Sequence, residues 1–250
     1  MTLFDFTFMP NFDSLIEELR KMAINEKWDY SYKVKNNHPI LCNYINHTFK
    51  KVYQDNLIVK CSDEEYAIFN TGLVTPNQEE IFAFMQKNNR EGARQPYFFH
   101  GWKIESDRNL SRFTKLASLP NYIDNPSNLI YDTGLDLRVN IEHIISDNIA
   151  RFPKNISSLD KSIIRNILSG AIDDAKKRVR RNYKTAIPQY YNGQLQLLLP
   201  ICFGDKSVAD LALVVERDNG GYRANTCLTL DMAINNARLI AKPDDEWLKI

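Results

Sequence analysis

Two apolar segments near the carboxyl end of the chain place the tightest constraint on its fold. They span residues 194–203 and 208–216, and their apolar residues run on without alternating with polar ones. A strand of this kind is covered on both faces, so we expect packed elements on either side of the sheet that contains it. The turn Asp218-Asn219-Gly220-Gly221 joins the second segment to a third expected strand, residues 222–230.

Helices are expected on both sides of these strands in the sequence. Apolar residues recur at helical spacing from Ser158 to Val179 and predict a long amphipathic helix. Asp231 is expected to cap a closing helix, and a short helix is expected between Ile141 and Ile149.

The first half of the chain contains a mixture of expected helices and short strands. Helices are predicted to begin at Phe12 and at Pro39, and a third helix is predicted from a cap at Asn77 to about Asn88. A turn is expected at Thr71-Gly72. Strands are expected at residues 56–61 and 66–70, joined as a hairpin, and at 97–102.

These elements predict an α+β fold, in which a helical amino-terminal part packs with a mainly antiparallel sheet and long amphipathic helices. Residues 1–117 are expected to form a helical and β-hairpin part, and residues 137–250 an α+β core. Between them, residues 118–136 are rich in Asn, Pro and Asp and predict a loop or linker. We find no internal sequence repeat.

Composition excludes several classes of protein. The 250 residues carry 32 basic and 31 acidic side chains, a net charge of +1, so only a local cluster could attract a polyanion. The four cysteines show no C-x-x-C spacing and are expected to be buried, reduced thiols. The four histidines lack zinc-ligand spacing, so the sequence predicts neither a metal nor a cofactor.

The chain is expected to be cytoplasmic and soluble. No segment approaches the roughly 18 apolar residues of a membrane span, and no basic region precedes the first apolar residues as in a signal peptide. Membrane partners are therefore not expected, and the oligomeric state is left open.

A local basic cluster stands at the end of the long expected helix, and it opens into a segment that contains no acid. The segment combines amide, ammonium, hydroxyl and aromatic groups. This combination suits RNA or a nucleotide, because cations neutralise phosphate, amides read base edges and aromatic rings stack. Complementing the helix dipole is the structural alternative. The cations of the helix end are Lys176, Lys177, Arg178, Arg180 and Arg181. Phosphate is assigned to Arg180, Arg181 and Lys184, edge reading to Asn182, Gln189 and Asn236, and stacking to Tyr190 or Tyr191.

Two residues suggest an enzyme instead. Asp210 lies inside an expected apolar strand, where an ionised carboxylate needs a partner, and we expect Arg238 or Lys184 to pair with it. His143 lies one helical turn before Asp147, which could orient the imidazole for acid–base catalysis or could form a structural hydrogen bond. A nuclease of the restriction type would need an E-x-K motif, which is missing after Glu216.

Several polar residues stand at the ends of apolar elements, where functional side chains are commonly presented. We expect them to converge on one cleft. They are Asn70, Arg151, Lys184, Gln189 and Arg238, with Asn148 as a further candidate for ligand binding.

Six motifs resemble a bacterial family named only as a domain of unknown function, family 3825. The resemblance covers nearly the whole chain from about Asp13. It implies no activity, but it implies an association with cold-shock-type and LOTUS-type modules that bind RNA. The motifs are Phe69-Asn70-Thr71-Gly72-Leu73, Asn148…Arg151-Phe152-Pro153, Asn182-Tyr183-Lys184-Thr185-Ala186-Ile187-Pro188-Gln189, Leu197-Leu198-Leu199-Pro200, Ala209-Asp210-Leu211-Ala212-Leu213 and Asn235-Asn236-Ala237-Arg238-Leu239-Ile240 ending in Asp244…Trp247-Leu248.

The leading hypothesis is a nucleic-acid or nucleotide binding protein, related most closely to RNA. An enzyme that processes a phosphodiester or a nucleotide, with Asp210 and His143, is the first alternative. A protein-interaction module with a purely structural polar core is the second. Salt dependence of binding separates the nucleic-acid binding protein from the protein-interaction module. Dependence on a divalent metal separates the enzyme from the binding protein.

Overall fold

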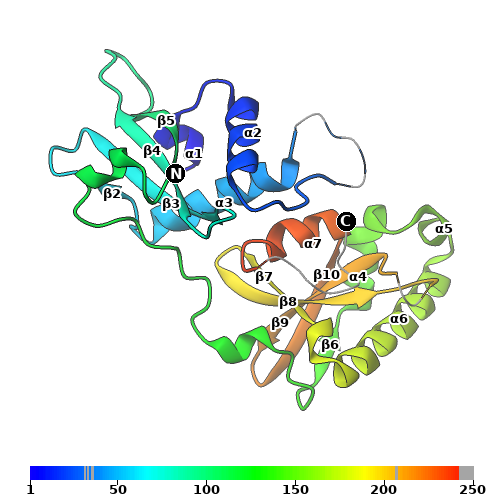
Figure 1. The fold of residues 1–250 in the computed structure, drawn as a ribbon. Helices are drawn as coiled ribbons and strands as arrows, with labels where there is room; N and C mark the ends of the chain where they lie inside the picture. Colours follow the sequence, from blue (N-terminus) through cyan, green and yellow to red (C-terminus); the bar gives the residue numbers. More distant parts are fainter. Residues whose placement is uncertain (31, 33, 35–36, 206–207, 242–250) are drawn as a thin grey trace. The chain divides into compact units, whose positions relative to one another are not determined.

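The computed structural model describes residues 1–30, 32, 34, 37–205 and 208–241. It divides into two compact units, Met1–Asn121 and Tyr122–Ile250, called the amino-terminal and carboxy-terminal units below (Figure 1). Each unit contains helices and a mixed sheet of five strands, which confirms the predicted α+β class.

The amino-terminal unit contains a sheet in the order β1-β5-β4-β3-β2. Its neighbouring strands are antiparallel except for β1 and β5, which run parallel. The helices are α1 (Leu3–Phe6), α2 (Phe12–Met22) and α3 (Pro39–Gln54), followed late in the unit by the 3-10 helix η1 (Arg108–Arg112). The strands are β1 (Thr7–Phe8), β2 (Val59–Lys60), β3 (Tyr66–Val74), β4 (Glu80–Lys87) and β5 (Tyr97–Ile104).

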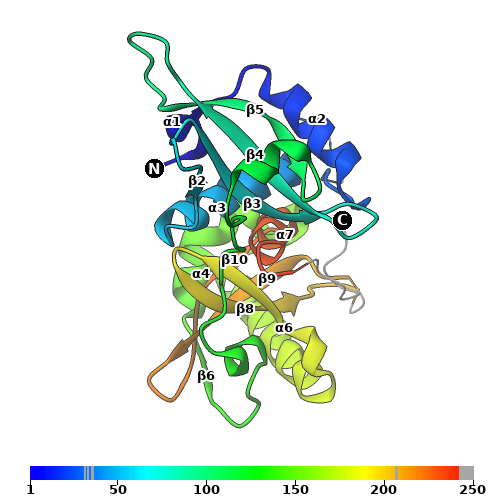
Figure 2. The same cartoon turned by 60° about the vertical axis from the view of Figure 1, so that its left-hand side comes forward.

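Each face of this sheet has its own covering. On one face α3 contacts β3 and α2 contacts β5 (Figure 2). The Trp102 indole of β5 donates a hydrogen bond to the Leu15 carbonyl of α2. On the other face, the segment from η1 to Ala117 packs its apolar side chains on β3 and β4.

Two expectations for this unit are wrong. Residues 77–88 form no helix, because β4 occupies Glu80–Lys87 and its central residues are buried on both faces. The cap-like Asn77 and Glu80 are a local signal, and the sheet outweighs it. Thr71-Gly72 is also no turn between elements, since β3 continues to Val74 with an irregular register from Asn70 onward.

The carboxy-terminal unit contains a sheet in the order β6-β10-β9-β8-β7, with β6 and β10 parallel and the other pairs antiparallel. Its helices are α4 (Ile141–Asn148), α5 (Lys154–Ser157), α6 (Lys161–Arg181) and α7 (Leu230–Ala237), with the 3-10 helices η2 (Pro126–Leu129), η3 (Ile149–Arg151) and η4 (Tyr183–Thr185). Its strands are β6 (Leu137–Val139), β7 (Ile187–Tyr191), β8 (Gln194–Ile201), β9 (Leu211–Asp218) and β10 (Gly221–Leu228).

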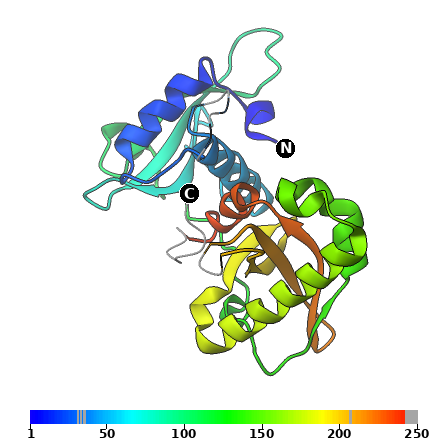
Figure 3. The ribbon, with the colours of Figure 1, turned by 90° about the vertical axis from the view of Figure 1, so that its right-hand side faces the viewer.

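Helices cover both faces of this sheet, as its continuous apolar strands predict. α4 and α6 pack on one face through a large apolar core, and α7 contacts β7, β9 and β10 on the other (Figure 3). β9 begins only at Leu211, so Asp210 precedes the strand and does not lie inside it. Thr229, not Asp231, caps α7, since its hydroxyl accepts a hydrogen bond from the Met232 amide.

The two units share one connectivity although their sequences do not repeat. In each unit an edge strand is followed by helices and then by four antiparallel strands, the last of which returns to pair in parallel with the first. The pair β1–β5 therefore corresponds to β6–β10, and β2, β3 and β4 correspond to β7, β8 and β9.

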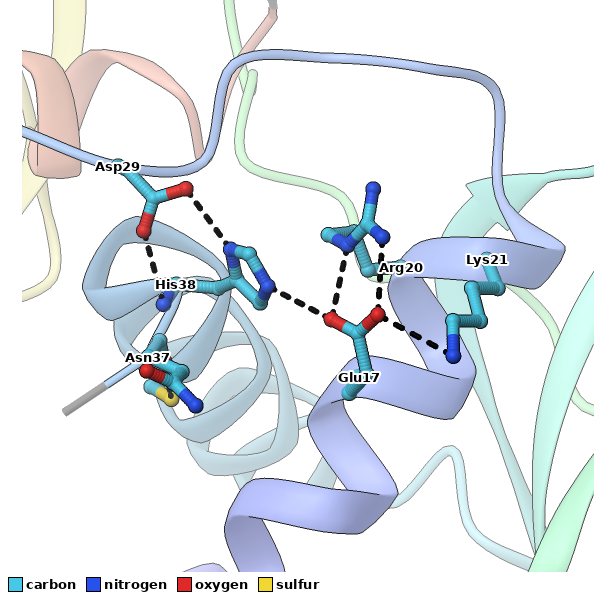
Figure 4. A network of polar contacts seen from close by, with 7 residues as sticks. Glu17, Arg20, Lys21, Asp29, Asn37 and His38 are labelled. Atoms are coloured by element: carbon cyan, nitrogen blue, oxygen red, sulfur yellow. Dashed lines mark hydrogen bonds and ion pairs between the residues drawn. The ribbon is translucent and has the colours of Figure 1, made fainter.

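A histidine bridges two carboxylates at the start of α3 (Figure 4). The His38 ring nitrogens lie 2.8 Å from Glu17 Oε2 and 2.9 Å from Asp29 Oδ2. Glu17 also binds Arg20 through two hydrogen bonds and Lys21 through an ion pair. The bridge connects α2 to the start of α3.

Glu17 should stabilise the protein in a pH-dependent way. Hydrogen bonds from Arg20, and then from His38, hold the pKa of the Glu17 carboxyl well below its usual range. A lowered folded-state pKa contributes stability that is present above the unfolded value, about 4.3, and is lost as the pH falls below it. The melting temperature of Glu17→Gln should therefore lie below that of the wild type at pH 7, and the difference should shrink below about pH 4. Glu18→Gln, at an exposed position of the same helix, is the matched control. Equal melting temperatures of Glu17→Gln and wild type at pH 7 would contradict this role.

Candidate functional site

The end of α6 and the following η4 present an exposed basic segment, defined by Lys177, Arg180, Arg181 and Lys184. These cations point away from the buried stripe of α6, which includes Leu168, Ala175 and Val179. Lys177 lies 4.0 Å from Asp174, and Arg181 Nε donates to the Lys177 carbonyl. Within the part of the chain that the structure describes, no ion pair involves Arg180, Arg181 or Lys184. Their positive charge is therefore available to an anion.

Polar and aromatic groups lie within or close after the basic segment. Asn182 caps η4, its side-chain oxygen accepting the Lys184 amide at 3.1 Å. The Tyr183 side chain is 60% exposed and Tyr191 is 48% exposed, so both can meet a flat ligand. Tyr190 instead contacts Tyr122 edge to face, with ring centroids 4.8 Å apart. Of the two tyrosines predicted to stack, Tyr191 is the more accessible.

A row of amides crosses the sheet beside α7. Asn236 Nδ2 donates to Gln189 Oε1 at 3.1 Å, Gln189 Nε2 donates to Gln196 Oε1 at 2.7 Å, and Gln196 Nε2 donates to Glu216 Oε1 at 2.6 Å. Gln189 and Gln196 are 1% and 6% exposed. We call these four residues the amide row. It brings together two predicted ligand-binding residues, Gln189 and Asn236, and it occupies both with internal hydrogen bonds.

Glu216 gives the amide row its direction. An ionised carboxylate only accepts, so Gln196 must turn its NH₂ group toward Glu216 and its oxygen toward Gln189. Gln189 must then turn its NH₂ group toward the Gln196 oxygen, so its own oxygen is left to accept from the NH₂ group of Asn236. Sequence reasoning missed Gln196, although an amide between two leucines of an apolar strand was a usable signal of a buried hydrogen-bond partner.

Asn148 and Arg151 bind the same segment of β10. Asn148 Oδ1 accepts from the Cys227 amide at 2.7 Å and from the Thr226 hydroxyl at 2.8 Å. Arg151 Nη1 donates to the Cys227 carbonyl and to the Thr226 hydroxyl. β6 pairs with β10 only as far as Ala224, and beyond that point these side chains bind the β10 backbone. The geometry gives both a structural role.

Asn70 has a comparable role in the amino-terminal unit. Its side chain accepts from the Gly72 amide at 2.9 Å and donates to Glu80 and to the Ala117 carbonyl. Gly72 has a φ of +73°, and a Cβ there would collide with the Tyr44 hydroxyl. Asn70 thus belongs to a different unit from the other residues expected in one cleft. Among those, Lys184 is exposed and Arg238 is half-buried after α7.

The two predicted catalytic residues have separate surroundings. Asp210 is half-buried, and its Oδ2 accepts the backbone amide of Phe203 at 2.7 Å. The expected cation is absent, since no described residue forms an ion pair with Asp210 and the backbone amide takes its place. His143 Nδ1 lies 3.4 Å from Asp147 Oδ2 on an exposed turn of α4. No described contact joins His143 to Asp210.

Thiol and metal chemistry depend on the burial of the cysteines and on the grouping of potential metal ligands. All four cysteines are free and buried, as predicted. Burial raises the pKa of the Cys227 thiol to about 12 and that of Cys42 to about 11, which keeps both protonated at neutral pH. Across the described ranges, no three His, Cys, Asp or Glu side chains are grouped so that they could hold a metal ion. Every helix in those ranges is too short or too polar to cross a membrane.

Comparison with known proteins identifies a family. A family model described as "Domain of unknown function (DUF3825)" matches residues 19–247, so the chain belongs to this family. No curated protein and no solved structure matches the chain.

Proposed function

We propose that this protein is a cytoplasmic RNA-binding protein whose basic segment contacts the phosphates of a single strand. The observation that carries the proposal is the exposure of Lys177, Arg180, Arg181 and Lys184 on one helix end, beside the exposed Tyr183. Cations of this kind supply the sequence-independent part of RNA affinity, and an exposed ring adds stacking. The cold-shock-type and LOTUS-type modules that the sequence resemblance implies favour the same ligand.

RNA accounts for the basic segment better than dipole compensation does. The helix dipole acts only on the last turn and is worth about 0.3–1 kcal/mol at a surface. Arg181 already lies beside a carbonyl of that turn, whereas Lys184 lies beyond the end of α6. A charge outside the helix, with no ion pair among the described residues, contributes little to folding and is suited to an external anion.

The affinity for single-stranded RNA should depend only moderately on salt. The basic segment offers four cations, and each phosphate contacted lowers the log–log salt slope by about 0.7. We therefore expect a slope of about −2 to −3, measured by filter binding across a salt series. Replacing Lys177, Arg180, Arg181 and Lys184 with Gln should flatten this slope and leave the fold intact.

A second quadruple variant provides the matched control. Gln at Lys50, Lys154, Lys161 and Arg165 removes the same charge from other exposed positions and should leave the slope nearly unchanged. The proposal fails if the wild type retains no RNA at low salt. It also fails if the basic-segment variant keeps the wild-type slope.

A further inference from the structure

On the face opposite α2 and α3, no described residue of the amino-terminal unit covers the part of the sheet formed by β1 and β5. The segment from η1 to Ala117 covers this face over β3 and β4, where it packs on Ile68, Phe82 and Phe84. On β1 and β5 the same face carries Phe8 and Phe98, which are 46% and 40% exposed. These two residues are register partners on parallel strands, and their ring centroids lie 6.0 Å apart.

The two rings begin a row that continues across the sheet. Gln86 on β4 is the register partner of Phe98, and Tyr66 on β3 is the partner of Gln86. The guanidinium of the exposed Arg112 lies 4.1 Å from the centroid of the Tyr66 ring. We call Phe8, Phe98, Gln86 and Tyr66 the aromatic row. Neighbouring strands are about 4.8 Å apart, so Phe8, Phe98 and Gln86 lie side by side on the open part of this face. The Tyr66 ring, stacked on Phe84 at a centroid distance of 5.1 Å and covered by Arg112, closes the far end of the row.

Cations gather at the β4–β5 end of the row, beside the two phenylalanines. Lys87 ends β4, and the loop between β4 and β5 adds the exposed Arg90 and Arg94. That loop contains one acid, Glu91. Arg94 lies 3.7 Å from Asp5 but remains 83% exposed. No carboxylate occurs in the row itself, but Asp63, Glu64 and Glu65 precede Tyr66. The charge that complements a polyanion is therefore confined to the end of the row formed by the β4–β5 loop.

The exposed phenylalanines are not a requirement of this fold. In the carboxy-terminal unit the corresponding strands β6 and β10 place Arg138 and Arg223 opposite each other, and both are exposed. A sheet of the same connectivity thus accepts charged residues at its first and last strands. Exposed rings on the β1–β5 pair need a reason other than folding.

A protein partner fits these observations less well than a nucleic acid. Taking about 200 Å² for a whole phenylalanine, the two rings expose on the order of 170 Å². A stable protein interface buries about 800 Å² on each partner and has an apolar centre. Aromatic rings in line on a sheet, with an amide and flanking cations, instead match how single-stranded bases are bound.

We propose that the aromatic row is a second RNA-contacting surface, on which unpaired bases stack. This inference rests on the proposed function for the class of ligand, but it concerns different residues in a different unit. The basic segment supplies phosphate contacts and the aromatic row supplies contacts to bases. The two surfaces therefore make separable contributions to binding.

The test compares the full chain with its Phe8→Leu/Phe98→Leu variant on two ligands. One is a single-stranded RNA oligonucleotide, and the other is an abasic ribose-phosphate oligomer of equal length and charge. The wild type should prefer the RNA, and the variant should lose about 10- to 100-fold in affinity for RNA while its affinity for the abasic oligomer is unchanged. Leucine keeps an apolar side chain at both positions, and Phe4→Leu, at an exposed ring of α1, is the matched control.

The outcomes distinguish this inference from the proposed function. Loss of the phenylalanines should leave the salt slope unchanged, and loss of the basic segment should leave the preference for bases unchanged. If the variant and the wild type prefer RNA over the abasic oligomer equally, the aromatic row does not bind bases, and the proposal for the basic segment is unaffected. If that result comes with loss of self-association in light scattering, the row is a contact between copies of the chain. A wild type that binds neither oligomer overturns both proposals.

Discussion

Replacing Gln196 with leucine is expected to lower the free energy of unfolding of the carboxy-terminal unit by about 2–5 kcal/mol. Gln196 lies in the middle of the amide row and is 6% exposed. Its loss leaves Gln189 Nε2 without an acceptor and removes the donor that contacts the Glu216 carboxylate at 2.6 Å. An unsatisfied buried amide costs about 1–3 kcal/mol, and a hydrogen bond to a charged group contributes about 1.5–3 kcal/mol.

A double-mutant cycle in urea tests this expectation. Gln189→Leu and Gln196→Leu together should cost less than the sum of the two single variants, because in the double variant neither glutamine is left unsatisfied by the loss of the other. Gln194→Leu, at an exposed position of the same strand, is the control and should change stability by less than about 0.5 kcal/mol. A cost for Gln196→Leu as small as the control's would mean that the amide row does not stabilise the unit.

The elements predicted correctly from sequence are those whose signal is strong and local. The long apolar stripe that ends at Val179 correctly predicts α6. The continuous apolar segments correctly predict β8, β9 and the helices on both faces of their sheet. Positions off the stripe, such as Arg180 and Arg181, are exposed as the helical period requires. In each case, a period of the sequence determines which side chains can be buried.

The elements that sequence reasoning missed depend on distant partners. β1 and β6 are two and three residues long, and each exists because it pairs with a strand much later in the chain. β7 contains Pro188 and lies at a sheet edge, where a missing N–H is tolerated. Short edge strands carry almost no pattern of their own, so only the completed sheet defines them.

The polar residues show the same division between local and distant information. The exposed basic segment is continuous in sequence and could be identified directly. Asn70 and Asn148 were also singled out, yet each binds backbone that is distant in the sequence: Asn70 binds the Ala117 carbonyl after η1, and Asn148 binds the Cys227 amide of β10. A polar residue at the end of an apolar element can bind a ligand or can satisfy the protein's own backbone. Only its hydrogen-bond partners in the structure distinguish the two roles.

Removing the side chain of Asn148 is expected to cost about 2–4 kcal/mol of stability. The Cys227 amide that donates to Asn148 Oδ1 is buried, and it lies beyond Ala224, where the pairing of β10 with β6 ends. In Asn148→Ala the amide keeps its desolvation cost without an acceptor, and the Thr226 hydroxyl loses the same partner.

Asn148→Asp separates this role from simple packing. An aspartate keeps the oxygen that accepts from Thr226 and Cys227, and it would lie near the Arg151 guanidinium, which binds the same two residues. We therefore expect Asn148→Asp to retain most of the wild-type stability in urea unfolding, while Asn148→Ala and Asn148→Leu do not. Hydrogen exchange should report the difference at its source, as faster exchange of the Cys227 amide in the alanine variant. If the aspartate variant were as unstable as the alanine variant, the shape of the amide and not its acceptor oxygen would hold β10 in place.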